Sequence, residues 1–222
     1  MIRTWVASVI PLYKEECYRA YYERAPVFRR EKADRYRGRQ MRAQSLGAWM
    51  LYEWMKKTYQ PAEDAEYNLS HSGEYVLCSV SMDAPPRKIL LGCDIERERE
   101  AVNLRMAERF FCPSESRQIK EETREDARRD LFGRYWVLKE SFLKATRKGM
   151  ALGMNTFEIL LGDPPVLLRQ PEAFPEKYYY REERIKGESG IYHIAVCSTD
   201  DEIDAVRQVK FGDEKEIIRR WG

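Results

Sequence analysis

Two carboxylates at the end of an apolar segment have a spacing that points to chemistry. The segment is Gly92-Cys-Asp-Ile-Glu96. Because side chains alternate between the two faces of a strand, Asp94 and Glu96 project together, while Cys93 and Ile95 project from the other face. Adjacent carboxylates repel each other unless water or a cation lies between them, and Mg²⁺ takes such ligands together with phosphate oxygens. A strand that runs out into a charged loop is the alternative interpretation.

A carboxylate and an ammonium lie one helical turn apart in a segment that is apolar nearly all round. Glu140 and Lys144 occupy positions i and i+4 of a predicted helix that contains residues 136–145, so both point to one side. A helix with this pattern is buried, and buried charges need partners or ions. The pair can hold a metal and an anionic oxygen together, or it can be a surface ion pair.

A histidine lies in a segment rich in turn-forming residues. His71 is flanked by Ser70 and Ser72 within residues 68–73, which lead directly into a predicted strand. The hydroxyls and backbone amides of such a loop can close on an anion. A structural or solvated histidine is the alternative.

The elements that must position these groups are strands grouped between long helices, which predicts an α+β fold. The turn residues Asp83-Ala-Pro-Pro86 predict a hairpin between the strands beside them, and Thr123 with Asp126 predicts a helix start. The expected elements are a strand over 5–10, helices over 14–24 and 29–59 (loosened near Gly38), strands over 74–82 and 88–96, helices over 101–111 and 123–149, strands near 155–161, 165–169, 177–182 and 191–198, and a terminal helix over 201–208.

Composition excludes several classes of protein. Apolar runs are only a few residues long, so no membrane association is expected. Five cysteines without a CxxC pair favour free thiols in a reducing cytoplasm. Two histidines exclude a histidine-rich metal site, which leaves a hard cation on carboxylates. A net charge of +2 argues against nucleic-acid binding by bulk charge.

Familiar nucleotide-binding and hydrolase motifs are absent from the sequence. It contains no P-loop, no GxSxG elbow and no GxGxxG after a strand. The three groups described above therefore carry the functional hypothesis.

Together and in this order, the three groups resemble the Sfp-type 4′-phosphopantetheinyl transferases. A looser match is the arginine-rich segment that ends at Arg42-Ala-Gln-Ser-Leu-Gly47. The segments that match family motifs are Asn68-Leu-Ser-His-Ser72, Gly92-Cys-Asp-Ile-Glu96, Arg109-Phe-Phe-Cys-Pro-Ser-Glu115 and Trp136-Val-Leu-Lys-Glu-Ser-Phe-Leu-Lys144.

The resemblance implies a fold of two similar α+β lobes in one chain, with the active site between them. Residues 1–90 would form the N-terminal lobe, and residues 91–222 the C-terminal lobe that carries the metal site. His71 then lies on the first lobe, and the acidic residues and Lys144 on the second.

The resemblance also implies an enzyme. Members of the family transfer the phosphopantetheine arm of coenzyme A to a serine of an apo acyl or peptidyl carrier protein, with Mg²⁺, and release adenosine 3′,5′-bisphosphate. By motif position, Asp94, Glu96 and Glu140 would bind the metal, and Glu140 or a water it orients would be the base. The other implied roles are Lys144 at the pyrophosphate, Glu115 as a supporting catalytic acid, and Ser70, His71, Arg42, Arg29 and Lys32 around the 3′-phosphate.

One departure and two alternatives accompany this interpretation. Many relatives carry Gly-Lys-Pro before the Ser-His motif, and residues 59–66 lack it, which puts the adenine contacts in doubt. A catalytically weakened relative would instead bind coenzyme A or a carrier protein as a module. The basic run 29–42 allows an RNA-binding alternative, but Tyr36 is its one internal aromatic residue able to stack on a base. We expect a cytoplasmic monomer that binds neither nucleic acid nor membrane.

Overall fold

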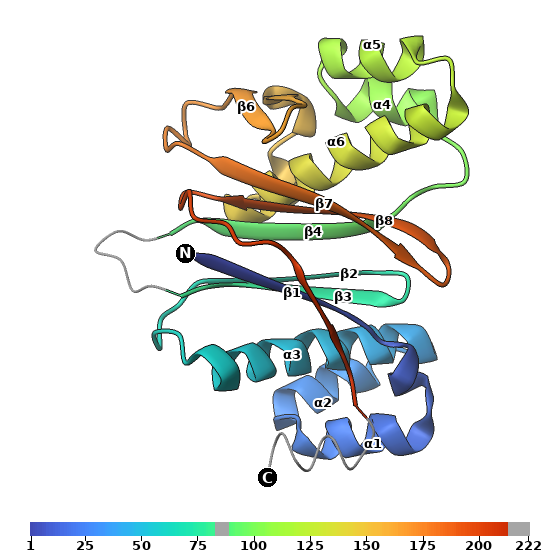
Figure 1. Ribbon diagram of the computed structural model, residues 1–222, viewed down its shortest axis with the longest axis vertical. Helices are drawn as coiled ribbons and strands as arrows, with labels where there is room; N and C mark the ends of the chain where they lie inside the picture. Colours follow the sequence, from blue (N-terminus) through green and yellow to red (C-terminus); the bar gives the residue numbers. More distant parts are fainter. Residues whose placement is uncertain (83–88, 213–222) are drawn as a thin grey trace.

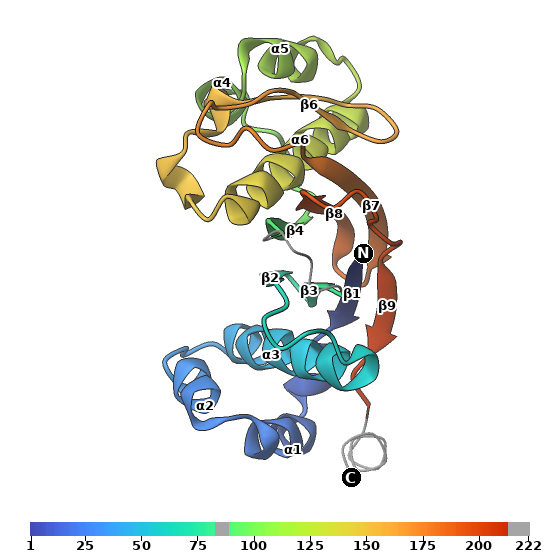
Figure 2. The ribbon, with the colours of Figure 1, turned by 90° about the vertical axis from the view of Figure 1, so that its left-hand side faces the viewer.

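Two helices of 21 residues each, α3 (Arg39–Tyr59) and α6 (Glu125–Ala145), cover the outer sides of two β-sheets (Figures 1 and 2). The computed structural model describes residues 1–82 and 89–212. The first sheet has the strand order β2-β3-β1-β9, the second β4-β8-β7, and β5 pairs with β6 in a small separate sheet. The predicted α+β class is confirmed.

The remaining bounds complete this architecture. The strands are β1 (Ile2–Ser8), β2 (Tyr67–Ser72), β3 (Tyr75–Ser81), β4 (Leu91–Arg97), β5 (Glu158–Leu160), β6 (Val166–Arg169), β7 (Tyr179–Gly187), β8 (Gly190–Ser198) and β9 (Arg207–Lys210). The other helices are α1 (Glu15–Arg24), α2 (Val27–Asp34), α4 (Leu104–Phe110) and α5 (Pro113–Glu121), with short 3₁₀ turns at Ile10–Tyr13, Gly149–Ala151 and Met154–Thr156.

Alternating side chains of the strands build three hydrophobic cores. On β1, Trp5 and Ala7 pack in the cluster shared with α3, while Val6 lies in the cluster between the two sheets. On β8, Ala195 packs in the cluster with α6, while Ile194 faces the space between the sheets. Both sheets are therefore buried on two sides, in a helix–sheet–sheet–helix arrangement.

The predicted hairpin between residues 74–82 and 88–96 is wrong. Strand β3 pairs with β1 on one side and β2 on the other, whereas β4 pairs with β8. Both edges of β3 are therefore taken, and the following chain enters the second sheet. The predicted turn residues, 83–86, lie outside the described residues.

The predicted terminal helix over 201–208 is also wrong. Residues Arg207–Lys210 form β9, which pairs in parallel with β1, and Ile203 makes a bridge to Ile2. Pairing with β9 gives hydrogen-bond partners to the backbone N–H and C=O groups along the remaining edge of β1, which a short, polar helix in this segment would leave unpaired. The end of the described chain thus returns to the first sheet, and the division at residue 90 stays a prediction.

The helices follow the sequence more closely, but several bounds differ, and α6 ends at Ala145 rather than at Gly149. The stretch 29–59 divides into α2 and α3 on either side of Gly38, and α5 was not predicted. Helix α6 begins after Arg124 without a side-chain cap, so the Thr123–Asp126 cap is wrong. In the described ranges, no helix is long and apolar enough to cross a membrane.

Strand β4 lies directly against the backbone of α6, and Gly92 makes this approach possible. A Cβ atom on Gly92 would lie 2.1 Å from the carbonyl oxygen of Ser141 and 2.3 Å from the nitrogen of Ala145. Any larger residue at position 92 must push the helix away from the strand. The glycine of the Gly-x-Asp-x-Glu motif therefore sets the distance between β4 and α6.

We predict that Gly92→Ala lowers the free energy of unfolding by about 1–3 kcal/mol, because the added methyl group meets helix backbone that cannot rotate away. Gly38→Ala is the control, since its Cβ would meet only the flexible end of Met41, at 3.4 Å. Denaturant unfolding of both variants measures the difference. Equal stabilities would show that α6 does not constrain β4.

Candidate active site

Strand β4 presents both of its acids to α6, as the alternation of side chains predicts. Asp94 and Glu96 follow Gly92 at intervals of two residues, so they share the face that contacts the helix. Cys93 and Ile95 are buried in the core between the sheets. Asp94 is 6 % exposed, whereas Glu96 is half-buried at the end of the strand.

Helix α6 brings a cation to these acids. The Nζ atom of Lys144 donates to Asp94 Oδ1 at 2.7 Å and to the carbonyl oxygen of Cys93 at 3.1 Å. Glu140 lies one turn earlier and is half-buried. Lys144 thus pairs across elements with β4, so the structure brings the predicted residues of β4 and α6 together.

The charges of this cluster are not balanced. Desolvation and then the negative charge of Asp94 raise the pKa of both Glu96 and Glu140. Desolvation is the largest single influence on Lys144 and acts to lower its pKa, but the charge and hydrogen bond of Asp94, together with the charges of Cys93 and Glu140, raise the pKa overall. The ammonium of Lys144 and, at Glu96, the guanidinium of Arg99 face three carboxylates, so negative charge is in excess and the cluster favours a further cation.

The donor set fits a hard divalent cation. Three carboxylates on two elements offer only oxygen atoms, and Mg²⁺ prefers a few carboxylates completed by water and phosphate oxygens. Asp94, Glu96 and Glu140 would hold the ion. While Lys144 occupies Asp94, the oxygens of the three carboxylates do not all lie within 4.8 Å of one another. Among the described residues, one other group of three has its ligand atoms that close together: Glu98, Asp130 and His193.

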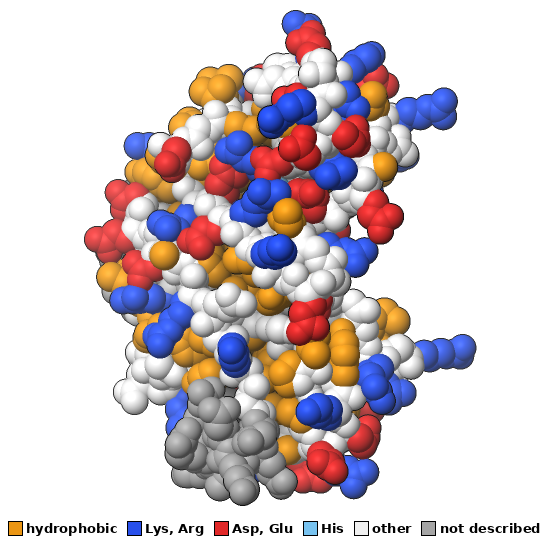
Figure 3. All heavy atoms as spheres, turned by 45° about the vertical axis from the view of Figure 1, so that its right-hand side comes forward, with side chains coloured by type: hydrophobic (Ala, Val, Ile, Leu, Met, Phe, Trp, Pro, Cys, Tyr) orange, Lys and Arg blue, Asp and Glu red, His pale blue; other side chains and the backbone are white. Residues whose placement is uncertain are grey.

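This second group is already paired with arginines. Glu98 contacts Arg129 and Arg184, both at 3.4 Å, and Asp130 contacts Arg184 at 3.5 Å. The Nε2 atom of His193 lies 3.3 Å from Glu98. Acidic and basic side chains are interspersed across the face of the molecule in Figure 3. Charge at this group is compensated by protein side chains, unlike charge at the β4–α6 cluster.

The predicted loop around His71 is a strand, and this corrects the placement of Ser70. Residues Tyr67–Ser72 form β2, which pairs with β3. Ser70 is buried, and its hydroxyl donates to Asp94 Oδ1 at 2.8 Å and accepts from Lys144 Nζ at 2.8 Å. His71 projects from the opposite face of the strand. Ser70 therefore belongs to the acidic cluster, and its hydroxyl does not face the same side as His71.

Helix α3 packs on β2 and α2 packs on α3, and both helices carry cations and unsatisfied donors. Partial desolvation, followed by the charges of Lys144 and Lys32, lowers the pKa of His71, an exposed residue. The Arg29 guanidinium lies 4.1 Å from the ring centre of Trp49. Three buried donors on these helices lack a hydrogen-bond partner among the described residues: Arg29 Nε, Ser45 Oγ and Trp49 Nε1. Such donors favour an anion.

Arg42 occupies a different place. Its Nε atom donates to the carbonyl oxygen of Tyr36 at 2.8 Å, and its exposed side chain lines a pocket with Arg37, Arg39 and Tyr18. The lining of that pocket includes neither His71 nor Lys32. The structure thus brings Lys32 toward His71, places Arg29 against Trp49, and leaves Arg42 in a separate pocket.

Comparison with known proteins places this geometry in a family. The sequence pattern of the 4′-phosphopantetheinyl transferase superfamily matches residues 90–197. The chain is 32% identical to 4′-phosphopantetheinyl transferase Sfp of Bacillus subtilis (strain 168) over 147 residues, which cover 66% of this chain and 60% of that protein. It is 37% identical to 4′-phosphopantetheinyl transferase psf-1 of Bacillus pumilus over 107 residues, 48% of this chain and 42% of the relative.

The chain belongs to the 4′-phosphopantetheinyl transferase superfamily. A more distant match, 30% identical over 111 residues, is the L-aminoadipate-semialdehyde dehydrogenase-phosphopantetheinyl transferase of Xenopus laevis, with 50% of this chain and 36% of that protein covered. The chain spans at most about 60% of the length of these relatives.

The region that matches the superfamily pattern contains the β4–α6 cluster but not the His71 side. Asp94, Glu96, Glu115, Glu140 and Lys144 all lie within residues 90–197. The residues of β2, α2 and α3 lie before it. Their link to the family therefore rests on the motifs before residue 90 and on the geometry described above.

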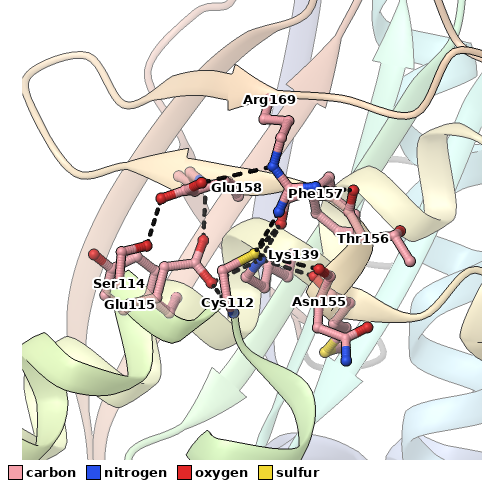
Figure 4. Close-up of polar contacts among 12 residues, drawn as sticks. Cys112, Ser114, Glu115, Lys139, Asn155, Thr156, Phe157, Glu158 and Arg169 are labelled. Atoms are coloured by element: carbon pink, nitrogen blue, oxygen red, sulfur yellow. Dashed lines mark hydrogen bonds and ion pairs between the residues drawn. The ribbon is translucent and has the colours of Figure 1, made fainter.

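Glu115 lies on α5 among residues of α6 and of the segment that begins β5 (Figure 4). It is 1% exposed. One oxygen accepts from the backbone of Cys112 at 2.8 Å, and the other accepts from the backbone of Ile159 at 2.8 Å. Its carboxylate also pairs with Lys139 at 2.9 Å. These contacts tie α5 to α6 and to the start of β5.

Lys139 precedes Glu140 on α6, but its side chain points away from the acidic cluster. Its buried Nζ atom donates to the carbonyl oxygens of Met154 at 2.9 Å and Phe157 at 2.7 Å, besides pairing with Glu115. Burial lowers the pKa of Lys139, and the charge of Glu115 opposes this shift. The pair joins α5, α6 and the start of β5, and so fixes the helix that carries Glu140.

We predict that Lys139→Met lowers the free energy of unfolding by about 3–5 kcal/mol, because it leaves the Glu115 carboxylate buried without its cation. Removing both charges with Lys139→Met and Glu115→Gln should restore part of the loss. Thermal or denaturant unfolding of both variants measures this coupling. Independent, additive effects of the two substitutions would contradict the assignment.

Proposed function

We propose that this protein transfers the 4′-phosphopantetheine arm of coenzyme A to a serine of an apo acyl or peptidyl carrier protein. The observation that carries the proposal is the unbalanced cluster of Asp94, Glu96 and Glu140 around Lys144, where the two sheets meet. The similarity to proteins named 4′-phosphopantetheinyl transferases supports it.

The charge distribution suits coenzyme A, which carries phosphate at two separated points. The carboxylates would hold Mg²⁺, and Lys144 would face the pyrophosphate, since its ammonium already lies among them. The 3′-phosphate would lie on the His71 side, where Arg29 and Lys32 supply charge. There the unsatisfied Nε–H, Oγ–H and indole N–H groups of Arg29, Ser45 and Trp49 would gain an acceptor.

The reaction would form a bond between the carrier serine oxygen and the β-phosphorus of coenzyme A, and break the bond from that phosphorus to the bridging pyrophosphate oxygen. Adenosine 3′,5′-bisphosphate leaves. When bound, Mg²⁺ supplies neutralisation of phosphate charge. Glu140 accepts the serine proton, directly or through a water that it orients, and its desolvated carboxylate is a stronger base than an exposed one. Lys144 neutralises phosphate charge from the protein side.

The carrier protein would dock beside α4. Carrier proteins of fatty-acid, polyketide and nonribosomal-peptide synthesis present the serine at a helix start within an acidic surface. Arg105 and Arg109 on α4 are exposed and offer the opposite charge. We further propose a monomer in the cytoplasm, consistent with five cysteines that are all free thiols.

Mass spectrometry of an apo carrier protein tests the function. After incubation with enzyme, coenzyme A and Mg²⁺, we expect the carrier to gain the mass of one phosphopantetheine group, and EDTA should abolish the gain. Glu140→Gln keeps the size of the side chain but removes the base and a metal ligand, so the transfer rate should fall by about 100-fold or more. Coenzyme A binding without transfer would favour a binding module, and undiminished transfer by Glu140→Gln would contradict the role of Glu140.

A second test concerns His71. Because its pKa is lowered in the free protein, the ring is neutral near pH 7, and a phosphate dianion favours the protonated form. Coenzyme A binding should therefore take up a proton and tighten as pH falls toward 6. Calorimetry in two buffers of different ionisation enthalpy measures the uptake.

His71→Ala should lose this uptake and about 1.5–3 kcal/mol of binding free energy, the usual cost of a hydrogen bond to a charged group. It should also bind coenzyme A and 3′-dephospho-coenzyme A with similar affinity. A variant that keeps the wild-type preference for the 3′-phosphate would show that His71 is structural.

A further inference from the structure

The outer edge of β4 faces β2, yet the two strands do not form a backbone ladder. Among the residues that the structure describes, β4 ends the second sheet and pairs through its backbone with β8 alone. Three of its backbone N–H groups point the other way, at Cys93, Ile95 and Arg97. An edge strand with unpaired N–H groups needs acceptors from elsewhere.

Side chains of β2 supply those acceptors at the same spacing of two residues. Asn68 Oδ1 accepts from the nitrogen of Cys93 at 3.1 Å. Ser70 Oγ accepts from the nitrogen of Ile95 at 3.4 Å, and Ser72 Oγ accepts from the nitrogen of Arg97 at 3.1 Å. These three contacts form a side-chain ladder, made by Asn68, Ser70 and Ser72, between two sheet edges.

The two serines of the side-chain ladder also hold the acids. Each hydroxyl accepts from the N–H of one β4 residue and lies beside the carboxylate of the residue before it. Ser70 donates to Asp94 at 2.8 Å. Ser72 lies close enough to Glu96 to oppose the rise in the pKa of that carboxyl. A hydroxyl is suited to this double task, because it donates one hydrogen and has two lone pairs.

Ser70 uses its full hydrogen-bonding capacity within the protein. It donates to Asp94 and accepts from Ile95 and from Lys144 Nζ at 2.8 Å. It is also only 6 % exposed. These contacts fix the rotamer of Asp94 and the position of Lys144 at the same time.

We propose that Asn68, Ser70 and Ser72 are positioning residues, which fix the carboxylates of Asp94 and Glu96 for the cation by binding the edge of β4. This inference rests on the proposed function, because it assigns a task to residues beside the proposed metal ligands. The ladder takes the place of a β-ladder and leaves the two sheets as separate sheets.

Metal binding provides a readout other than activity. We would measure the dissociation constant of Mn²⁺, as a probe for Mg²⁺, from the electron paramagnetic resonance signal of the free ion in the presence of saturating coenzyme A. Ser70→Ala and Ser72→Ala should each weaken Mn²⁺ binding by about 10-fold or more, as loss of groups that orient metal ligands commonly does. Ser72→Thr keeps the hydroxyl and should stay within about 3-fold of wild type.

Ser198→Ala is the matched control. Ser198 is a buried strand serine whose hydroxyl accepts from the nitrogen of Asp200 at 3.0 Å, on β8 and without a role at the acids. It should lose stability in thermal unfolding but bind Mn²⁺ as wild type does. If Ser70→Ala fails to fold, the half-buried Ser72 decides the matter through its alanine and threonine variants.

Two failures can be told apart. If wild type binds Mn²⁺ and the alanine variants bind it within 2-fold, the ladder does not position the ligands and the proposal is overturned, while the proposed function stands. If wild type binds no Mn²⁺ in the presence of coenzyme A, the metal site of the proposed function fails, and the role of the ladder fails with it.

Discussion

The edge of β4 is the constraint on which the rest of the structure depends. One edge of the strand pairs with β8, the other is bound by side chains of β2, and one face lies against the backbone of α6. Each neighbour restricts the sequence differently. The helix requires glycine at position 92 of β4. The unpaired edge of β4 requires short polar side chains at alternate positions of β2. The face toward α6 then holds Asp94 and Glu96 where a residue of the helix can reach them.

Two lysines on α6 differ in the number of carboxylates around them, and this difference distinguishes a structural ion pair from a ligand-binding cluster. Lys139 is matched by Glu115, both are almost completely buried, and two backbone carbonyl groups complete the lysine's hydrogen bonds. Lys144 instead meets three carboxylates, of which Asp94 holds it directly. A buried ion pair whose charges cancel holds its elements in place. A cluster with excess negative charge destabilises the protein unless a cation binds to it. The unbalanced cluster lies where the two sheets meet, open to groups from both.

The sequence predicted those features that depend on local pattern. Alternation placed Asp94 and Glu96 on one face, and helical spacing placed Glu140 and Lys144 on one side of α6. Pairing between distant strands was not predictable in this way. Turn residues after β3 suggested a hairpin, yet the edges of β3 were taken by β1 and β2. The short segment that forms β9 owes its conformation to the free edge of β1, which lies 200 residues earlier in the chain. Ser70 was assigned to a loop because its neighbours are typical of turns, and its actual partners come from β4 and α6. The pairing of Lys139 with Glu115 was likewise hidden, because it joins two helices that sequence spacing alone does not bring together.

The central claim is that the excess negative charge between β4 and α6 exists to bind a divalent cation together with the pyrophosphate of coenzyme A. Calorimetric titration of the wild-type protein with coenzyme A, in Mg²⁺ and then in EDTA, tests it most directly, because two ligands that share a site must change each other's affinity by the same factor. The account predicts that coenzyme A binds at least about 10-fold more tightly with Mg²⁺, a coupling of about 1.4 kcal/mol. Equal affinity in the two buffers would contradict it.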